Sequence, residues 1–368
     1  MRIALIVPGG VGQDGVHLVI PALLDLIGEL ATRHELLVAA LEQGDAPTSY
    51  ELRGARVVCL GRASLGRRLA RLLGGLRGFQ PQLLHSFWLG TTSTLGLLAG
   101  ATLGVPLVAS LGGGELVRLP QIGYGGRLSA RQRAHTALAL GRSHVVTAGS
   151  RYALGPLLAR RRDARLVPLG AALVDGATAA RPPGPPWQLL TVASINRVKG
   201  PEVLLRALAL ARGELRARTG CAEPFTLDWV GQDVLDGTAH RLAAGLGLGK
   251  AVRFHGWRPH SEALALARRA HLYLQASYHE SQGVAVCEAA SAATPTVGTA
   301  VGLVAELAPE AAVAVPPGDP AALGRAIVMT LTDPPCREAL GRSARQWARA
   351  HDAAWTARQF EQLYGTPR

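Results

Sequence analysis

Apolar residues follow two different periodicities along this chain of 368 residues, and the two alternate. Short apolar runs have the length of buried strands, and the stretches between them repeat apolar positions every three or four residues, as amphipathic helices do. This alternation is typical of doubly wound α/β layers. In the first half, the expected strands cover residues 3–7, 36–41, 57–60, 83–85, 106–110, 144–148 and 165–168. A glycine-rich turn after the first strand leads into an expected helix over 16–31.

The same pattern starts again after a segment, 175–187, that contains four prolines and is too stiff for a helix or an inner strand. The expected strands of the second half cover residues 189–193, 225–230, 252–254, 271–275, 296–298 and 312–315. The expected helices cover residues 201–212, 238–248, 319–332 and 337–364. We therefore expect two Rossmann-like domains whose strand ends face a central cleft, where ligands bind in such sheets.

The stretch 86–114 has no charged residue and imitates a membrane span. Glycines and threonines interrupt it, and Pro106 divides it, so a buried helix followed by a core strand is the better interpretation. The four cysteines form no CxxC pair, which argues against a disulfide framework or a zinc site and favours a cytoplasmic protein.

The formal net charge of +13 comes almost entirely from arginine, because Lys199 and Lys250 are the only lysines. The early arginine clusters are Arg62, Arg67, Arg68, Arg71 and Arg77, then Arg127, Arg131 and Arg133, then Arg160, Arg161 and Arg162. Solvated helix surfaces explain them most simply, but such faces also attract anionic lipid headgroups and nucleic acid. No nucleic-acid-binding motif accompanies the charge, so we expect at most peripheral binding to the inner face of a membrane.

The segment 277–295 carries the clearest chemical signal. Glu280 and Glu288 stand eight residues apart with Gly283 between them, and a run of small residues follows. If a helix starts at Gly283, the amides of its first turn form an anion site suited to a diphosphate. On spacing alone, a surface loop with solvated glutamates is the simpler interpretation.

A second segment, 191–200, follows an expected strand and opens a helix. Arg197 and Lys199 would lie at the carboxyl edge of that strand, where two fixed cations can neutralise the charge on a departing diphosphate. A solvated lysine at the start of a helix is the alternative interpretation.

Together these segments resemble the C-terminal domain of the retaining GT-B glycosyltransferases of family 4, also called group 1 glycosyltransferases. The E-x7-E element of that family is matched by Glu280 and Glu288, and its lysine-glycine pair by Lys199-Gly200. Further matches are Trp229-Val230-Gly231, Val252-Arg253-Phe254-His255-Gly256, Pro295-Thr296-Val297, Val167-Pro168-Leu169-Gly170, and Trp355 with Leu363-Tyr364. The resemblance is strongest over 189–306.

The resemblance implies a GT-B fold with four parts. Residues 1–175 would be a Rossmann-like acceptor-binding domain and 176–187 a proline-rich linker. Residues 188–345 would be a Rossmann-like donor domain for the nucleotide-sugar, and 346–368 a helix that returns to pack on the N-terminal domain.

The resemblance also implies roles for individual residues. Glu280 would contact the transferred sugar and Lys199 would bind the diphosphate, with Arg197 as a second cation. The remaining implied donor-binding residues are Glu288 at the ribose, Gly283 and Val284 at the diphosphate, Gly256 and Trp257 at the nucleobase, Asn196, Gly12 or Gly15 in the first loop, and Gly112 with Gly113.

Two positions depart from the family pattern. Many relatives carry an arginine where this chain has Ser194, and Arg197 can supply that charge. Many relatives also carry a histidine near the sugar where this chain has Gly112. The amides of the glycine run can replace that donor, or His85 or Glu115 can reach the sugar, and a tight strand-to-helix turn explains the glycines equally well.

The chain contains no Asp-x-Asp motif, so we expect neither a metal nor a cofactor, with cations and a helix N-terminus stabilising the leaving group. The resemblance implies transfer of a hexosyl unit, with retention, from a donor such as a UDP- or GDP-sugar. The acceptor would be a glycan, such as a cell-envelope polysaccharide, or a lipid-linked saccharide. The alternatives are a nucleotide-sugar epimerase, a non-catalytic nucleotide-sugar-binding protein and, least favoured, a nucleic-acid-binding protein.

Overall fold

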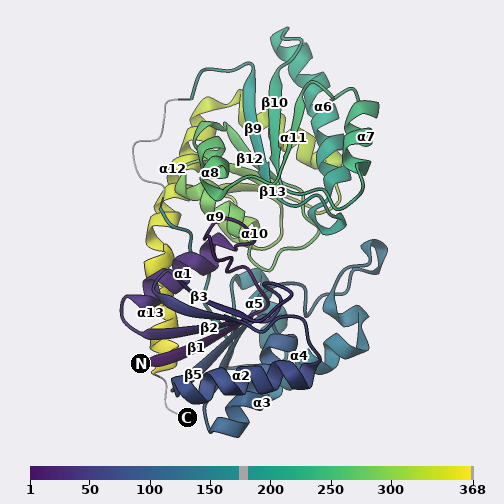
Figure 1. Ribbon diagram of the computed structural model, residues 1–368. Helices are drawn as coiled ribbons and strands as arrows, with labels where there is room; N and C mark the ends of the chain where they lie inside the picture. The colour runs from purple at the N-terminus through teal and green to yellow at the C-terminus, as the bar shows by residue number, and fades with distance from the viewer. Residues whose placement is uncertain (174–180, 366–368) are drawn as a thin grey trace. The chain divides into compact units, whose positions relative to one another are not determined.

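The computed structural model describes residues 1–173 and 181–365, and the chain divides into two compact units (Figure 1). Unit 1 combines Met1–Gly170 with the terminal segment His351–Arg368, and unit 2 consists of Ala171–Ala350. Each unit has its own sheet with helices on both faces, so the predicted pair of Rossmann-like domains is confirmed. The part of the expected linker from 176 to 180 lies outside the described residues.

The sheet of unit 1 has eight strands in its described part, in the order β3-β4-β2-β1-β5-β6-β7-β8. The strands are β1 (Arg2–Val7), β2 (Glu35–Ala40), β3 (Thr48–Leu52), β4 (Ala55–Cys59), β5 (Leu83–Phe87), β6 (Leu107–Leu111), β7 (Val145–Ala148) and β8 (Arg165–Leu166). All neighbours pair in parallel except β3 and β4, which form an antiparallel hairpin at one edge. The central strands are almost wholly buried because helices cover both faces.

The helices of unit 1 are α1 (Pro21–Ala31), α2 (Leu65–Phe79), α3 (Thr91–Leu103), α4 (Ala130–Arg142), α5 (Arg151–Leu158) and α13 (Ala353–Tyr364), with short 3-10 turns η1 (Pro120–Ile122) and η2 (Gly126–Leu128). One core joins α1 and α13 to the sheet, and a second joins α2 and α3 to it. A third core lies under α4 and α5.

The terminal helix α13 is an integral part of unit 1, which confirms the predicted return of the chain. Phe360 and Tyr364 are buried in the same core as α1. The Thr356 hydroxyl donates to the Pro168 carbonyl at 2.8 Å and accepts from the Gly170 N–H at 2.9 Å. The helix is therefore bonded to the last residues of the N-terminal segment.

The sheet of unit 2 has six parallel strands in its described part, in the order β11-β10-β9-β12-β13-β14. They are β9 (Trp187–Val192), β10 (Phe225–Val230), β11 (Val252–Gly256), β12 (Leu272–Gln275), β13 (Thr296–Thr299) and β14 (Ala312–Val315). The helices of unit 2 are α6 (Pro201–Thr219), α7 (Thr238–Gly245), α8 (His260–Arg269), α9 (Val284–Ser291), α10 (Leu303–Leu307), α11 (Pro320–Thr332) and α12 (Pro334–Ala350), with the turn η3 (Arg197–Lys199). The core on one face joins α6, α7 and α11, and the other joins α8, α9, α10 and α12.

In each sheet the strand order reverses at one point. Unit 1 reverses between β1 and β5, and unit 2 reverses between β9 and β12. The loops that leave the carboxyl ends of the two strands diverge there and leave a crevice, which is where open α/β sheets bind ligands. These two crevices position the candidate functional residues.

Three sequence predictions need correction. The helix expected over 16–31 begins only at Pro21, because the preceding residues form a loop in which Asp14 accepts the N–H groups of Val16 and His17. The helix expected over 337–364 is two helices, since Asp352 starts α13 by accepting the N–H of Trp355 at 2.7 Å. The pattern also gave no range for strand β3 or for helices α2, α4, α5, α8 and α10.

The charge-free stretch 86–114 contains α3 and then β6, as predicted. Among the helices that the structure describes, none combines the length and the apolar character needed to span a bilayer.

Candidate functional site

In unit 2, the loops that follow β9 and β12 are locked together by their backbones. Gly200 has φ +61°, and a side chain there would place its Cβ 2.2 Å from the Ala276 carbonyl oxygen. The N–H of Tyr278 donates to the carbonyl of Val198 at 2.8 Å. Only glycine permits this approach, which brings the turn η3 against the loop that carries Glu280.

Lys199 and Glu280 meet across these loops. The Lys199 Nζ lies 2.6 Å from Glu280 Oε1, and the Ser277 hydroxyl donates to the same oxygen at 2.7 Å. Solvent reaches 28% of the lysine side chain and 12% of the glutamate side chain. Because both groups are largely shielded, their attraction is stronger than that of a surface pair. Asn196 accepts the N–H of Lys199 at 3.2 Å and thereby caps the turn η3.

Helix α9 starts directly after this ion pair. Gly283 has φ +92°, and the amides that follow it precede the first intrahelical hydrogen bond. A Cβ at Gly302 would lie 2.4 Å from the Gln282 carbonyl oxygen and 2.8 Å from the Glu280 Cβ. The loop after β13 therefore packs closely against the loop that precedes α9. The amides of Gly283 and Val284 and the Lys199 ammonium lie on connected segments and are suited to a diphosphate.

Glu288 is the fifth residue of α9 and is largely buried. Its Oε1 lies 2.9 Å from Nε2 of His260, the first residue of α8. The imidazole fixes the orientation of this carboxylate. The carboxylate oxygens of Glu288 can then accept hydrogen bonds from hydroxyl groups in a defined direction. The sequence did not indicate this contact, because His260 lies on α8, a helix that the pattern did not predict.

Three other predicted residues of unit 2 are not drawn into this cluster. Arg197 is exposed on η3 and forms no ion pair with any residue that the structure describes. Gly256 ends β11 with φ +66°, and Trp257 follows with 45% of its surface exposed. Strand β10 separates β11 from β9 in the sheet. The roles predicted for these residues stay predictions.

In unit 1, the loop after β1 contains Gly12 and Gly15. A Cβ at Gly12 would lie 1.9 Å from the His17 carbonyl oxygen, and Gly15 has φ +67°. The N–H of Gly15 donates to the Gly12 carbonyl at 2.9 Å. Both glycines are thus needed for the turn itself, and their predicted contact with a ligand stays a prediction.

Glu115 is buried beneath the glycine run that follows β6. Its Oε1 accepts from the N–H of Leu89 at 3.0 Å and of Gly112 at 3.1 Å, and its Oε2 accepts from the N–H of Gly113 at 2.7 Å. Burial raises the pKa of Glu115, while these backbone donors act in the opposite direction. The Glu115 side chain thus fixes the conformation of the glycine loop, and it also lines a cavity next to that loop.

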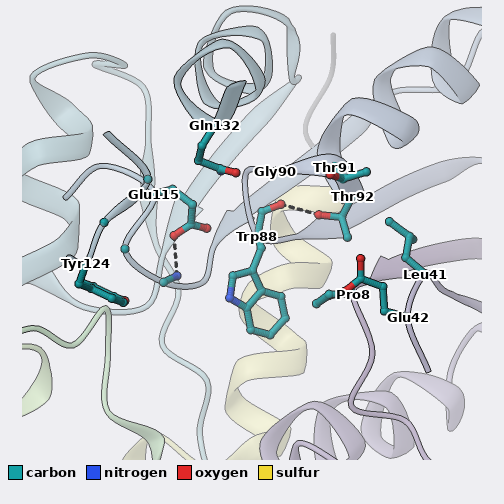
Figure 2. Close-up of a pocket in the computed structure, with 14 residues that line it drawn as sticks. Pro8, Leu41, Glu42, Trp88, Gly90, Thr91, Thr92, Glu115, Tyr124 and Gln132 are labelled. Carbon is teal, nitrogen blue, oxygen red and sulfur yellow. Dashed lines mark hydrogen bonds between the residues drawn. The ribbon is translucent and has the colours of Figure 1, made fainter. Parts of the chain in front are cut away.

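That cavity, of about 510 Å³, opens at the carboxyl ends of the strands where the order of unit 1 reverses (Figure 2). Trp88 stands in its middle with φ +67°, a conformation that costs a bulky residue about 1–3 kcal/mol. Hydroxyl groups of Thr92 and Ser93 contact the Trp88 carbonyl at 2.6 and 2.9 Å and hold this backbone in place. The sequence did not indicate Trp88 as a site residue.

The structure explains why residue 112 is glycine. A Cβ at Gly112 would lie 2.7 Å from three atoms of the Trp88 indole. The indole therefore occupies the space that a side chain at residue 112 would enter.

His85, the other candidate near the sugar, lies in the core of unit 1 with no exposed surface. Its Nδ1 is 2.7 Å from the Tyr364 hydroxyl, and its Nε2 is 2.8 Å from the Ser110 hydroxyl. Burial lowers the pKa of His85 to about 3, so the ring is neutral. This geometry favours a structural role, in which His85 joins α13 to the sheet, over contact with a substrate.

Comparison with known proteins finds similarity to the same family as the motifs. Residues 179–347 match the family model for glycosyl transferases of group 1. The D-inositol 3-phosphate glycosyltransferase of Corynebacterium efficiens is 34% identical over 190 residues, which cover 49% of this chain and 44% of that protein. The enzyme of the same name from Salinispora arenicola is 32% identical over 298 residues, 72% of this chain and 64% of that protein. The chain thus spans less than two thirds of the length of either relative.

Solved structures extend the likeness to both units. Sucrose-phosphate synthase from Thermosynechococcus elongatus has a TM-score of 0.78 at 20% identity, covering 99% of this chain and 98% of that one. Anabaena HepE in complex with UDP and glucose has a TM-score of 0.75 at 18% identity, covering 99% of both chains. Residues 179–347 therefore match the group 1 family of glycosyl transferases, and the two units of the chain have the GT-B fold.

Proposed function

We propose that this protein is a glycosyltransferase that moves a hexosyl unit from a nucleotide-diphospho-sugar to a saccharide or lipid-linked acceptor. The observation that carries the proposal is the cluster of Lys199, Glu280 and Ser277 at the N-terminus of α9. A cation, a carboxylate and unsatisfied amides within one crevice match the diphosphate and the sugar of such a donor.

Each end of the donor has a partner in unit 2. Lys199 and the amides of Gly283 and Val284 bind the diphosphate, and Glu280 accepts hydrogen bonds from the hydroxyl groups of the sugar. Glu288, oriented by His260, accepts from the ribose hydroxyls. Gly256 and Trp257 contact the nucleobase. The binding of UDP and glucose by HepE makes UDP-sugars the first donors to test.

The reaction breaks the bond between the anomeric carbon and the diphosphate oxygen and forms a bond from that carbon to an acceptor oxygen. The acceptor proton passes to the departing phosphate oxygen on the same face, so the anomeric configuration is retained. Lys199 and Arg197 neutralise the charge that develops on the diphosphate. The absence of an Asp-x-Asp motif from the sequence supports a reaction in which these cations replace a metal.

A basic helix in unit 1 bears on the nature of the acceptor. Helix α2 carries Arg67, Arg68, Arg71 and Arg77 without any acidic residue. This composition supports peripheral binding to an anionic membrane that holds a lipid-linked acceptor. The names of the relatives add a phosphorylated cyclitol, D-inositol 3-phosphate, to the acceptors worth testing.

The test is a thermal-shift panel of UDP, GDP, ADP and their sugar conjugates with the wild type and Glu288→Ala. A ligand at about 100 times its dissociation constant stabilises the folded state by about 2.7 kcal/mol, which raises the melting temperature by several degrees. We expect a shift for one nucleotide family that Glu288→Ala abolishes. Glu214→Ala, on α6 outside this cluster, where the carboxylate pairs with Arg218, is the matched control and should keep the shift.

Turnover then separates the alternatives. Release of nucleoside diphosphate only when an acceptor is present supports the transferase. Conversion of the donor without an acceptor would favour an epimerase, and a nucleotide shift without turnover over a broad acceptor panel would favour a non-catalytic binding protein. No shift with any nucleotide, in a folded protein, would refute the donor site.

A further inference from the structure

The cavity of unit 1 has walls unlike those of the cluster in unit 2. Two aromatic side chains, Trp88 and Tyr124, line it together with the polar side chains of Glu42, Gln132 and Thr91. Trp88 lies between Glu115 and Tyr124 on one side and Pro8 and Glu42 on the other (Figure 2). Neither lysine nor arginine is among the residues that line the cavity.

The glycine run after β6 is shaped around these two rings. A Cβ at Gly112 would lie 2.7 Å from the Trp88 indole, and a Cβ at Gly114 would lie 2.6 Å from the Tyr124 ring. Two glycines of one loop therefore each accommodate an aromatic face. The loop thus packs closely against both rings, and a larger residue at either glycine would displace one of them.

The amides of this loop are already occupied. Glu115 accepts from the N–H groups of Gly112, Gly113 and Leu89, which would otherwise be free to bind an anion. Glu42 adds a second carboxylate at the rim, with 67% of its side chain exposed, and its Oε1 lies 3.5 Å from Nη1 of Arg68. A phosphate group entering the cavity would meet two acidic side chains and no cation among the lining residues, because the Arg68 guanidinium beside the rim is already paired with Glu42. It would also find none of these three amides available.

The donors and acceptors that remain suit hydroxyl groups. The indole N–H of Trp88 has no acceptor among the residues that the structure describes, and the Gln132 amide nitrogen is directed to the Leu89 carbonyl at 3.2 Å, which leaves its oxygen as an acceptor. Flat aromatic faces with a few polar groups at the edge are the usual composition of a small-molecule site. A ring with apolar faces and a hydroxylated edge fits this description.

We propose that this cavity binds an uncharged saccharide or polyol ring stacked on Trp88, and that Glu115 and Glu42 make it discriminate against phosphorylated rings. If the proposed glycosyl transfer is correct, this ring is the acceptor, and Trp88 is its specificity-determining residue. The binding itself requires no nucleotide, so it can be tested separately from the donor site.

The experiment measures binding of methyl α-glucoside, myo-inositol, glucose 6-phosphate and inositol 1-phosphate by calorimetry, without nucleotide. We expect at least one uncharged ring to bind the wild type about tenfold more tightly than its phosphorylated counterpart. Trp88→Ala should weaken that binding about tenfold, whereas Trp88→Phe, which keeps an aromatic face, should lose much less. Tyr152→Ala, on α5 outside the cavity, is the control and should bind as the wild type does.

A second variant tests the charge discrimination independently. Glu42→Lys replaces the carboxylate that pairs with Arg68 by a cation at the exposed rim. It should raise affinity for the phosphorylated ring while the uncharged ring binds as before. Tighter binding of a phosphorylated ring to the wild type, unchanged binding in Trp88→Ala, or no binding of any probe would overturn the proposal. These results would leave a Glu288-dependent nucleotide shift intact, so failure here is distinguishable from failure of the proposed function.

Discussion

Replacing Lys199 with methionine removes the cation of the proposed donor site and keeps a side chain of similar length. In the structure, Glu280 then loses the partner 2.6 Å away and keeps only the Ser277 hydroxyl at 2.7 Å. With 12% of the glutamate side chain exposed, water can replace little of that contact. The variant should therefore lose both stability and transition-state stabilisation.

The two losses have different sizes. At 2.6 Å, and with an effective dielectric constant of about 20, the Coulomb attraction is about 6 kcal/mol before desolvation. Both groups regain hydration on unfolding, so the net cost to the free energy of unfolding is about 1–3 kcal/mol, or several degrees in melting temperature. Loss of one fixed charge at a leaving group lowers kcat about 100- to 1000-fold.

The assay is nucleoside diphosphate release under saturating donor, with the melting temperature of each variant measured in parallel. Lys250→Met removes the only other lysine, which is exposed, and should change neither quantity. Lys199→Arg retains the charge and should recover part of the rate. In a double-mutant cycle, Lys199→Met should cost less stability in the Glu280→Gln background. Full activity in Lys199→Met, or additive stability losses, would refute the reasoning.

The remaining predictions concern stability and membrane binding. His85, with its pKa lowered to about 3, stays neutral in the folded protein while the unfolded chain takes up a proton below about pH 6.5. The free energy of unfolding should thus fall by about 1.4 kcal/mol per pH unit from pH 6 to pH 4, and urea titrations of His85→Gln should lack this component. Gly200→Ala should destabilise the protein by well over 1 kcal/mol, because φ is +61° and a carbonyl oxygen lies 2.2 Å from the added Cβ. Gly213→Ala, on α6 with no atom within 4 Å of the added Cβ, should stabilise it by up to about 1 kcal/mol, and equal melting temperatures for the two variants would contradict both. Arg67→Gln with Arg77→Gln should reduce sedimentation with anionic vesicles at low salt, and unchanged sedimentation would argue against α2 as the membrane surface.

The sequence pattern predicted the layered architecture well because buried parallel strands are continuous apolar runs. It failed where burial is one-sided or absent: β3 is a mostly exposed edge strand, TSYEL, without such a run. The pattern also extended the first helix across 16–20, where apolar residues occur. In the structure these residues form a loop, because the Asp14 carboxylate accepts the N–H groups of Val16 and His17.

The placement of Lys199 and Glu280 could be predicted in part because each lies on a loop directly after a strand. The spacing of Glu280 and Glu288 around Gly283 indicated a helix start, and α9 does begin there. His260 and Trp88 could not be predicted, because their contacts depend on pairings between distant segments. The glycine run at 112–114 was visible, but its reason, two aromatic rings packed against it, exists only in three dimensions.

The assignment of α13 to unit 1 has a consequence for how the chain is made. Unit 1 needs residues from both ends, because His85 is covered by Tyr364, whereas unit 2 is continuous from Ala171 to Ala350. During synthesis, unit 2 can therefore complete its core while the first 170 residues still lack their last helix. A chain that ends between α12 and α13 would contain all of the second unit and a first unit whose core is open to solvent.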